Sequence, residues 1–110
     1  MKAENKITLY LADDHPIVVD GLREILKAND RLEVIGAAHD GEELIRLLKQ
    51  RKSDLVVLDI NMPKMDGIKC TRYIKDHFPD LKVIILTMYP EKTYAGQLIK
   101  AGADGCILKS

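Results

Sequence analysis

The chain has 110 residues, which is enough for one small domain with a single hydrophobic core and too few for two. Hydrophobic residues make up 46% of it and charged residues 31%, as in a folded soluble domain and unlike a disordered segment. The 17 Lys and Arg residues balance the 17 Asp and Glu residues, which excludes a general electrostatic attraction to nucleic acid or to a membrane surface.

The sequence predicts a cytoplasmic location. Residues 1–6 are polar, and the apolar run that follows is too short for a signal peptide. The longest strongly apolar runs, LVVL and VIIL, fall far short of the ~20 residues that a membrane-spanning helix needs. Cys70 and Cys106 lack the spacing of a metal site. A disulfide between them is possible, but we favour two buried thiols in a reducing compartment.

Strands and helices are predicted to alternate along the chain. Pro16 suits the first turn of a helix, Asp40 and Glu43 form a capping-box-like pair before another, and Gly102 is placed to end the last. The apolar pattern predicts strands at 7–12, 32–38, 54–59, 82–86 and 105–109, and helices from about 16, after 40, over 67–77 and over 91–101, with a loop at 60–67. Repeated β-α-β units with right-handed crossovers predict an α/β fold, a doubly wound parallel sheet with helices on both faces.

Polar side chains gather at the predicted strand ends, where ligands bind in sheets of this kind. Four of the five strands end in carboxylates, a hydroxyl or an ammonium group: Asp13, Asp14, Asp59, Thr87 and Lys109. The remaining strand is followed by His39 and Asp40, which we assign to a surface turn and a helix cap. Each of these residues alone would be an ordinary strand end or cap, but their combination at one edge of the sheet predicts a binding site.

These residue types suit a divalent cation and a phosphoryl group. Aspartates with an ordinary pKa near ~3.9 are charged at neutral pH, so the carboxylates repel one another unless a cation lies between them. Mg²⁺ prefers oxygen ligands and is typically held by one or two carboxylates together with a phosphate. Asp13 and Asp14 are therefore predicted to serve the metal, and Asp59 to be a nucleophilic carboxylate that forms an aspartyl phosphate. Thr87 and Lys109 would hydrogen-bond and neutralise the phosphoryl oxygens.

From residue 7 to residue 110 the sequence resembles the receiver domain of bacterial two-component response regulators. The resemblance is carried by ADD at 12–14, DLVVLDINMPKMDG at 54–67, VIILT at 83–87 and GADGCILK at 102–109. The segments ADDHP, LTM and GADG look most like the NarL/FixJ-type regulators. In those regulators a DNA-binding helix-turn-helix domain follows the receiver.

The resemblance implies a flavodoxin-like strand order of 2-1-3-4-5 and a set of roles. By resemblance, Asp59 accepts a phosphoryl group from a histidine kinase, and Thr87 and Lys109 are the switch hydroxyl and the phosphate-binding lysine. The implied Mg²⁺ site consists of Asp13, Asp14, Asp59 and the main-chain carbonyl of Asn61. The chain would then be a phosphorylation-controlled switch and not an enzyme, apart from assisting its own phosphorylation and dephosphorylation. It would pair with a second copy when phosphorylated, and contact DNA only through a domain beyond residue 110.

Three positions depart from the pattern of many receivers. Cys106 stands where many have a tyrosine or phenylalanine that turns inward on activation, which puts that aromatic response in doubt. Met88 is bulky where many have a small residue, which would restrict access to the phosphate, and Ser110 replaces a frequent proline. None of these changes removes a residue needed for phosphorylation.

Three other functions fit the sequence less well. A Mg²⁺-dependent phosphatase resembling the haloacid dehalogenases would need a second Asp two residues after the nucleophile on the first strand, where this chain has His15. A flavin-binding module would need a phosphate loop rich in Ser, Thr or Gly in place of DDHPIV. A scaffold that works unphosphorylated would not need the complete set of acidic residues.

The histidines are given no functional role by the sequence. A neutral imidazole is a poor ligand for Mg²⁺, so we expect His15 to lie on the surface where the first helix begins. His39 and His77 show no partner spacing and are expected to face solvent.

Receivers of this family place a fifth helix after the fifth strand, and only Ser110 follows Lys109 here. Without that helix, we expect apolar side chains on one face of the sheet to meet water, namely Leu9, Leu11 and either Ile107 or Leu108. Each exposed side chain of this kind would cost about 1.5–3 kcal/mol. We therefore predict a longer natural protein, and the 110-residue chain should unfold at a lower temperature, or self-associate more, than one extended by the next helix. Equal melting temperatures, with a monomer in sedimentation, would contradict this.

Overall fold

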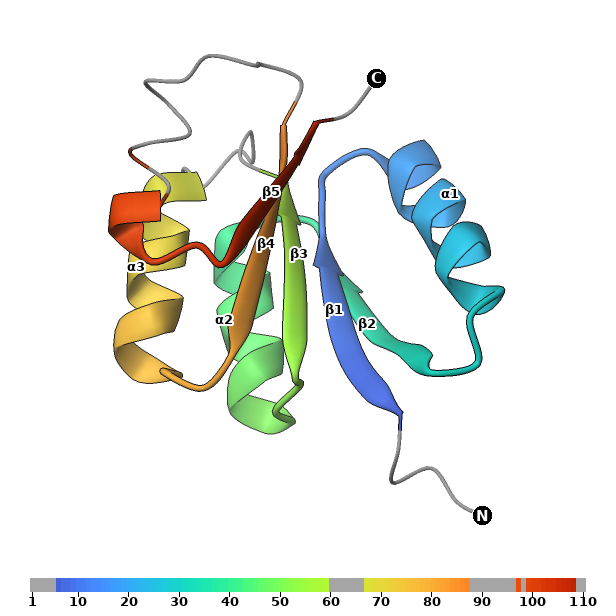
Figure 1. Ribbon diagram of the computed structural model, residues 1–110, viewed down its shortest axis with the longest axis horizontal. Helices are drawn as coiled ribbons and strands as arrows, with labels where there is room; N and C mark the ends of the chain where they lie inside the picture. Colours follow the sequence, from blue (N-terminus) through green and yellow to red (C-terminus); the bar gives the residue numbers. More distant parts are fainter. Residues whose placement is uncertain (1–5, 60–66, 88–96, 98, 109–110) are drawn as a thin grey trace.

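The computed structural model describes residues 6–59, 67–87, 97 and 99–108, which contain one five-stranded parallel sheet (Figure 1). The strands are β1 (Ile7–Ala12), β2 (Leu32–Ala38), β3 (Leu55–Asp59), β4 (Lys82–Thr87) and β5 (Gly105–Leu108). They lie in the order β2-β1-β3-β4-β5, and every neighbouring pair is parallel. The doubly wound α/β fold and the strand order are therefore confirmed.

Three helices have described bounds: α1 (Pro16–Lys27), α2 (Gly41–Gln50) and α3 (Gly67–His77). All three begin where the sequence predicts. Residues 97 and 99–101 are also helical, whereas the rest of the predicted helix at 91–101 and most of the loop at 60–67 lie outside the described residues. Gly102 has a φ of +111° and donates its N–H to the carbonyl of Ile99, so it ends this last helix as predicted. No helix in the described segments is long and apolar enough to cross a membrane.

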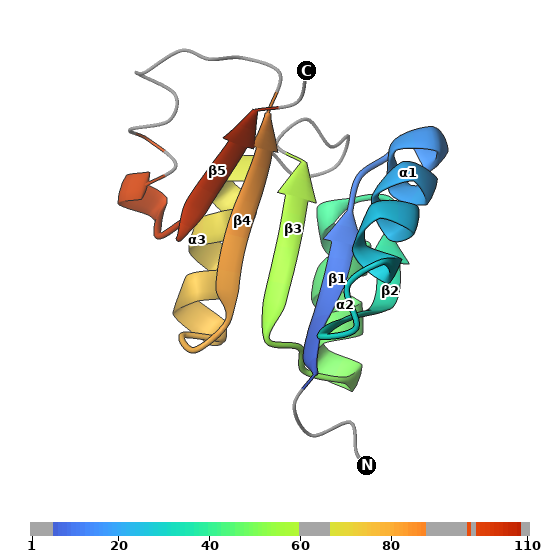
Figure 2. The ribbon, with the colours of Figure 1, turned by 45° about the vertical axis from the view of Figure 1, so that its right-hand side comes forward.

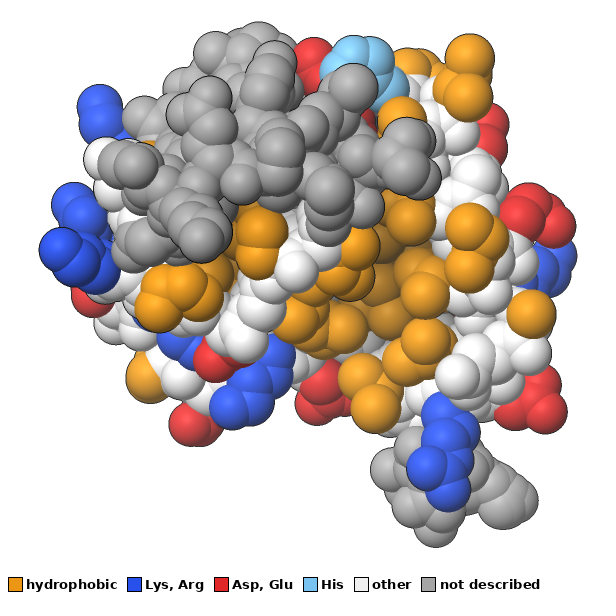
Figure 3. Space-filling view, turned by 45° about the horizontal axis from the view of Figure 1, so that its top comes forward, with side chains coloured by type: hydrophobic (Ala, Val, Ile, Leu, Met, Phe, Trp, Pro, Cys, Tyr) orange, Lys and Arg blue, Asp and Glu red, His pale blue; other side chains and the backbone are white. Residues whose placement is uncertain are grey.

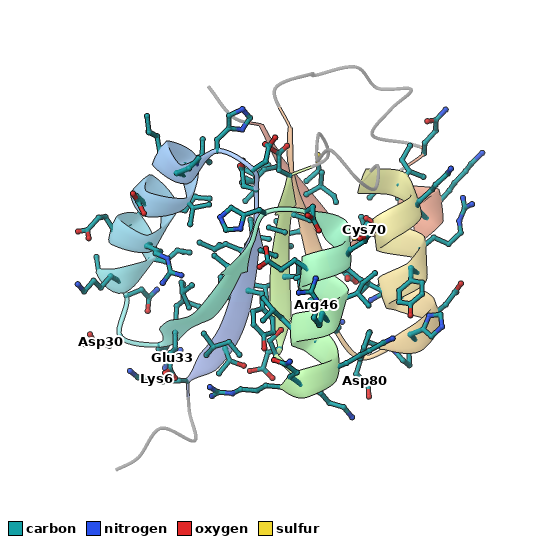
Figure 4. The ribbon with its side chains drawn as sticks, turned by 180° about the vertical axis from the view of Figure 1, so that it is seen from behind. Lys6, Asp30, Glu33, Arg46, Cys70 and Asp80 are labelled. Atoms are coloured by element: carbon teal, nitrogen blue, oxygen red, sulfur yellow. The ribbon has the colours of Figure 1, made fainter. Side chains whose placement is uncertain are left out.

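The helices form layers on the two faces of the sheet. In Figure 4, which shows the molecule from behind, α2 and α3 lie in front of the strands, and α1 lies on the other side. The main core is between the sheet and the α2–α3 layer, and its buried members include Tyr10, Leu44, Leu48, Val56, Leu58, Cys70, Ile74, Val83 and Ile85. Cys70 is buried, as expected, but Cys106 on the edge strand β5 is exposed, so the prediction of two buried thiols is wrong.

The α1 face of the sheet is only partly covered. Helix α1 lies beside β1 and β2 (Figure 2), and Figure 3 shows apolar side chains gathered on this face. Ile107 on β5 is 53% exposed, as expected. The expectation for Leu9 and Leu11 is wrong, because both are fully buried. They belong to an interior strand, so side chains of β2 and β3 flank them, while the uncovered part of the face lies toward the edge strand.

Gly36 allows β1 and β2 to approach each other closely. The register between the strands shifts here, since Leu9 pairs with Val34 but Tyr10 pairs with Gly36. A Cβ atom at residue 36 would lie 2.8 Å from the Tyr10 ring. That ring is fixed, because its hydroxyl donates to the carbonyls of Arg51 at 2.7 Å and Leu47 at 3.2 Å at the end of α2. Burial raises the pKa of Tyr10, with a smaller opposing effect of the Arg51 charge. The glycine that weakens the strand pattern in the sequence is therefore a packing requirement.

A partly exposed ion pair connects α3 to the residue before β5. Lys75 Nζ donates to the carbonyl of Leu81 at 2.8 Å and to Asp104 Oδ2 at 3.1 Å, and the same carboxylate oxygen accepts the N–H of Val83 at 2.9 Å. Burial by itself would raise the pKa of Asp104, but the Val83 hydrogen bond and the Lys75 ammonium outweigh it and the pKa is lowered. These contacts fix the chain where the last strand begins.

Two glycine substitutions test this packing in opposite directions. Gly36→Ala should lower the free energy of unfolding by about 1–3 kcal/mol, because the new methyl group overpacks against the fixed Tyr10 ring. Gly21→Ala, in the middle of α1 where a Cβ would meet nothing within 4 Å, should raise it by about 0.5–1 kcal/mol. Urea unfolding of both variants measures the difference. Equal effects of the two variants would contradict the role given to Gly36.

Candidate functional site

The carboxyl ends of β1 and β3 bring together the acidic residues that the sequence predicts. Asp13 and Asp14 directly follow β1, and Asp59 is the last residue of β3, which pairs with β1. Asp13 is 1% exposed and Asp59 is 2% exposed. One carboxylate oxygen from each of the three, together with a ring nitrogen of His15, lie within 4.8 Å of one another. The predicted cluster of carboxylates is therefore present.

Asp13 is held in place by the main chain around it. Its N–H donates to the carbonyl of Ala38 at 3.0 Å, which continues the pairing of β1 with β2 by one residue. Its Oδ1 atom accepts the N–H of His15 at 2.9 Å, so the carboxylate also closes the turn into α1. A side chain fixed in this way is preorganised for binding, since little conformational entropy remains to be lost.

Asp14 supplies an oxygen that lacks a hydrogen-bond donor. Its Oδ1 atom is buried and makes no hydrogen bond within the described part of the chain, although it lies 3.0 Å from His15 Nδ1. Burying an acceptor without a donor costs about 1–3 kcal/mol. A carboxylate oxygen in this position is suited to a cation, which satisfies it without a donor hydrogen.

His15 is exposed at the start of α1, as expected, and its ring also lies against the carboxylates of the site. Its side chain is 62% exposed, but Nδ1 lies 3.0 Å from Asp13 Oδ1, 3.0 Å from Asp14 Oδ1 and 4.0 Å from Asp59 Oδ2. Because an ionised carboxylate can only accept, Nδ1 carries the hydrogen in its bond to Asp13. Its place directly after the acidic pair was the one signal in the sequence that could have revealed this position.

The donor set fits Mg²⁺. It consists of hard carboxylate oxygens on converging strand ends, one of them buried without a hydrogen-bond donor. When bound, the ion would neutralise the carboxylates and polarise an oxygen of a phosphoryl group. Asp13, Asp14 and Asp59 are the described residues that would hold it.

The remaining predicted site residues are only partly described. Thr87 is the last residue of β4 and pairs in register with Leu108, which places it at the same edge of the sheet as Asp59. Lys109 would follow Leu108 directly, but Lys109 and Asn61 lie outside the described residues, as does Met88. Their predicted roles stay predictions.

The residues after β2 form a helix cap, as predicted. Asp40 accepts the N–H of Glu43 at 2.8 Å at the start of α2. Glu43 Oε1 in turn accepts the N–H of His39 at 2.7 Å and contacts its Nδ1 at 3.0 Å. These hydrogen bonds from the His39 main chain and ring lower the pKa of Glu43. His39 is exposed as expected but does have a partner. His77 is also exposed, and its ring stacks on Tyr73 and donates to the Tyr73 carbonyl.

The model of the response regulator receiver domain family matches residues 9–110. The chain belongs to this family. It is 36% identical over 106 residues to the transcriptional regulatory protein DegU of Brevibacillus brevis, covering 96% of this chain and 45% of DegU. It is 38% identical over 103 residues to the oxygen regulatory protein NreC of Staphylococcus carnosus, covering 93% of this chain and 48% of NreC. This receiver domain thus spans about half the length of these curated relatives.

Solved structures of the family agree with the fold. The isolated receiver domain of RcsB from Salmonella enterica serovar Typhimurium, with the phosphomimetic BeF₃⁻, superposes with a TM-score of 0.91 at 34% identity, covering 96% of this chain and 78% of that one. The receiver domain of NarL from Mycobacterium tuberculosis gives a TM-score of 0.89 at 28% identity, with coverages of 94% and 84%. RcsB has also been solved bound to DNA. The sequence resemblance to NarL-type receivers is therefore confirmed.

Replacing Asp14 by Asn tests the electrostatic description of the site. Without Mg²⁺, Asp14→Asn should raise the free energy of unfolding by about 1 kcal/mol, because one of the mutually repelling charges is gone. Mg²⁺ at about a hundred times its dissociation constant should stabilise the original chain by about 2.7 kcal/mol, and the variant much less. Thermal unfolding with EDTA and with Mg²⁺ measures both effects.

Asp80→Asn is the matched control. Asp80 is exposed in the turn after α3, at the opposite end of the molecule (Figure 4), so its replacement should leave the Mg²⁺ effect unchanged. If Asp14→Asn gains as much stability from Mg²⁺ as Asp80→Asn does, Asp14 has no part in holding the ion.

Proposed function

We propose that this receiver domain is a phosphorylation-controlled switch that accepts a phosphoryl group on Asp59 in the presence of Mg²⁺. The convergence of Asp13, Asp14 and Asp59 at the carboxyl edge of the sheet is the observation that supports it best. Among the three, Asp59 is the last residue of the central strand β3, whereas Asp13 and Asp14 lie beyond the end of β1. The other two come from the turn into α1, as expected for residues that hold an ion beside the nucleophile.

The proposed reaction is a displacement at phosphorus. A carboxylate oxygen of Asp59 attacks the phosphoryl group of a phosphohistidine on a sensor kinase. The new O–P bond forms as the P–N bond breaks, and the imidazole leaves with a proton from solvent. Preorganised charges supply most of the catalysis in such transfers. Thr87 and Lys109 are the proposed donors to the phosphoryl oxygens, and we propose that Asn61 adds its carbonyl to the Mg²⁺ ligands.

Phosphorylation would act by shifting a conformational equilibrium. A phosphoryl group that binds one of two conformations better moves the population toward that conformation. A differential binding free energy of about 1–3 kcal/mol is enough for regulation. We propose that this shift changes the surface near β4 and β5 and favours pairing with a second copy.

The full-length protein is proposed to regulate transcription in the cytoplasm. DegU is named as a transcriptional regulatory protein, and RcsB binds DNA in a solved complex. Because this chain spans about half of such relatives, DNA contact would come through a further domain beyond residue 110. The receiver itself carries no net charge that would attract DNA. In this proposal the chain is not an enzyme toward other substrates, which separates it from the Mg²⁺-dependent phosphatase and from an unphosphorylated scaffold.

Phosphorylation with a small acyl phosphate tests the proposal directly. Incubation with Mg²⁺ and acetyl phosphate should add the mass of one phosphoryl group, and hydroxylamine should remove it, as it does from an acyl phosphate. Asp59→Asn should abolish the addition, whereas Asp80→Asn should keep it, and intact-mass spectrometry measures both. Full labelling of Asp59→Asn would overturn the assignment, and sustained turnover of acetyl phosphate far beyond one equivalent would favour the phosphatase.

A further inference from the structure

We propose that the His15 imidazole competes with the cation for the carboxylates of this site, so that Mg²⁺ binds as the ring turns away. The proposal rests on the proposed metal site and deepens it, because it names a residue that sets the affinity of that site for the ion. It is carried by one hydrogen bond, in which His15 Nδ1 is the donor, and by the place of this donor among three acidic side chains.

One oxygen atom of Asp13 accepts two hydrogen bonds from His15. The main-chain N–H of His15 donates to Asp13 Oδ1 at 2.9 Å, and the ring Nδ1–H donates to the same atom at 3.0 Å. A carboxylate has about four lone-pair sites on its two oxygens, so the two donors use both sites of this atom. An ion can therefore bind Asp13 Oδ1 only by displacing one of the two donors.

The ring nitrogen also lies close to the other two carboxylates. Nδ1 is 3.0 Å from Asp14 Oδ1 and 4.0 Å from Asp59 Oδ2. Asp14 Oδ1 is the buried oxygen that makes no hydrogen bond within the described part of the chain. A cation bound to it would be repelled by the positive end of the nearby Nδ1–H dipole. The ion and the ring donor thus compete for one group of oxygens.

Of the two donors to Asp13, the ring is the one that can leave. The main-chain N–H of His15 is fixed, because the carbonyl of the same residue accepts the N–H of Val19 at 3.1 Å in α1, and Pro16 follows in the first turn. The His15 side chain is 62% exposed, so it can rotate into water. Mg²⁺ binding then breaks the ring hydrogen bond, whereas the turn that positions Asp13 stays intact.

The strength of this hydrogen bond determines how far the ring weakens cation binding. Because a tenfold change in affinity corresponds to about 1.4 kcal/mol, a hydrogen bond of ordinary net strength changes the dissociation constant by about three- to tenfold. The opposite sign is expected if the ring instead orients the carboxylates, since loss of such an indirect partner typically weakens metal binding by about 10–100-fold. The sign of the change therefore separates competition from support.

Calorimetric titration with MgCl₂ measures this sign. The chains compared are the original, His15→Ala, His15→Asn and, as the matched control, His77→Ala, since His77 is an exposed histidine at the far end of α3. His15→Ala should lower the dissociation constant for Mg²⁺ by about three- to tenfold, because the competing donor is gone. His15→Asn, whose amide N–H takes the place of Nδ1 along the side chain, should stay close to the original, and His77→Ala should equal it.

Three results of the titration would overturn the proposal. Weaker Mg²⁺ binding by His15→Ala would show that the ring orients the carboxylates. Unchanged binding would show that the ring has no effect on the ion. Equal strengthening in His15→Ala and His15→Asn would show that the Nδ1–H donor is not the competitor.

Long-range ¹H–¹⁵N NMR spectra of the histidine rings give a second readout, which needs no variant to fold. In the metal-free chain in mildly alkaline solution, His15 should carry its hydrogen on Nδ1, because the bond to Asp13 fixes this tautomer. Saturating Mg²⁺ should release the ring and move the hydrogen largely to Nε2, the tautomer that histidine prefers in water, while the signals of His77 stay the same. A His15 ring that keeps its Nδ1–H in the loaded chain contradicts the competition.

Failure of the proposed metal site itself would look different. If the original chain binds no Mg²⁺ and Asp14→Asn has no effect on Mg²⁺ stabilisation, the site is wrong and the competition falls with it. If Mg²⁺ binds and Asp14→Asn weakens its binding, but His15→Ala gives no strengthening, the site stands and only the competition is wrong.

Discussion

The mutual repulsion of three aspartates at the carboxyl edge of the sheet is the constraint on which the rest of this structure depends. Asp13 and Asp59 are almost completely buried, and Asp14 has a buried oxygen with no hydrogen-bond donor in the described part of the chain. Carboxylates this close are unfavourable without a counter-charge. A fold that keeps them does so at the expense of stability, which is common at functional sites.

Hydrogen bonds, an ion pair and buried apolar side chains elsewhere in the sheet offset the free-energy cost of the repulsion among the three aspartates. At the opposite edge, charges are matched to donors: Asp54 Oδ2 accepts the N–H of Thr8 at 2.9 Å and its hydroxyl at 3.2 Å. The ion pair of Lys75 with Asp104 stabilises the approach to β5 in the same way. The strands between these contacts are filled with fully buried aliphatic side chains. Among the described residues, the one buried side-chain oxygen that lacks a hydrogen-bond donor lies in the site, on Asp14.

Much of the fold could be predicted from the sequence because its signals are local. Buried strands such as 82–86 read as short apolar runs, and Pro16, Asp40 and Gly102 mark helix ends through main-chain chemistry that depends on a few neighbours. The predictions that were wrong concerned residues whose burial depends on packing between segments far apart in the sequence. Leu9 and Leu11 were expected to be exposed because their cover was judged from the helices alone, whereas the neighbouring strands bury them. Cys106 was expected to be buried, but the order of the strands puts it on an edge.

The same distinction, between what the element order determines and what depends on side-chain packing, explains which parts of the site could be predicted. That parallel strands end at one edge is a property of the topology, so the meeting of Asp13, Asp14 and Asp59 follows from the element order once each is placed at a strand end. The position of the His15 ring does not follow, because it depends on side-chain torsions in the turn into α1. The Asp13 carboxylate that closes this turn also brings the imidazole over the acidic pair. An N–H donor is thereby placed against the acidic pair, so the geometry of this turn, and not the order of the strands, determines where the ring lies.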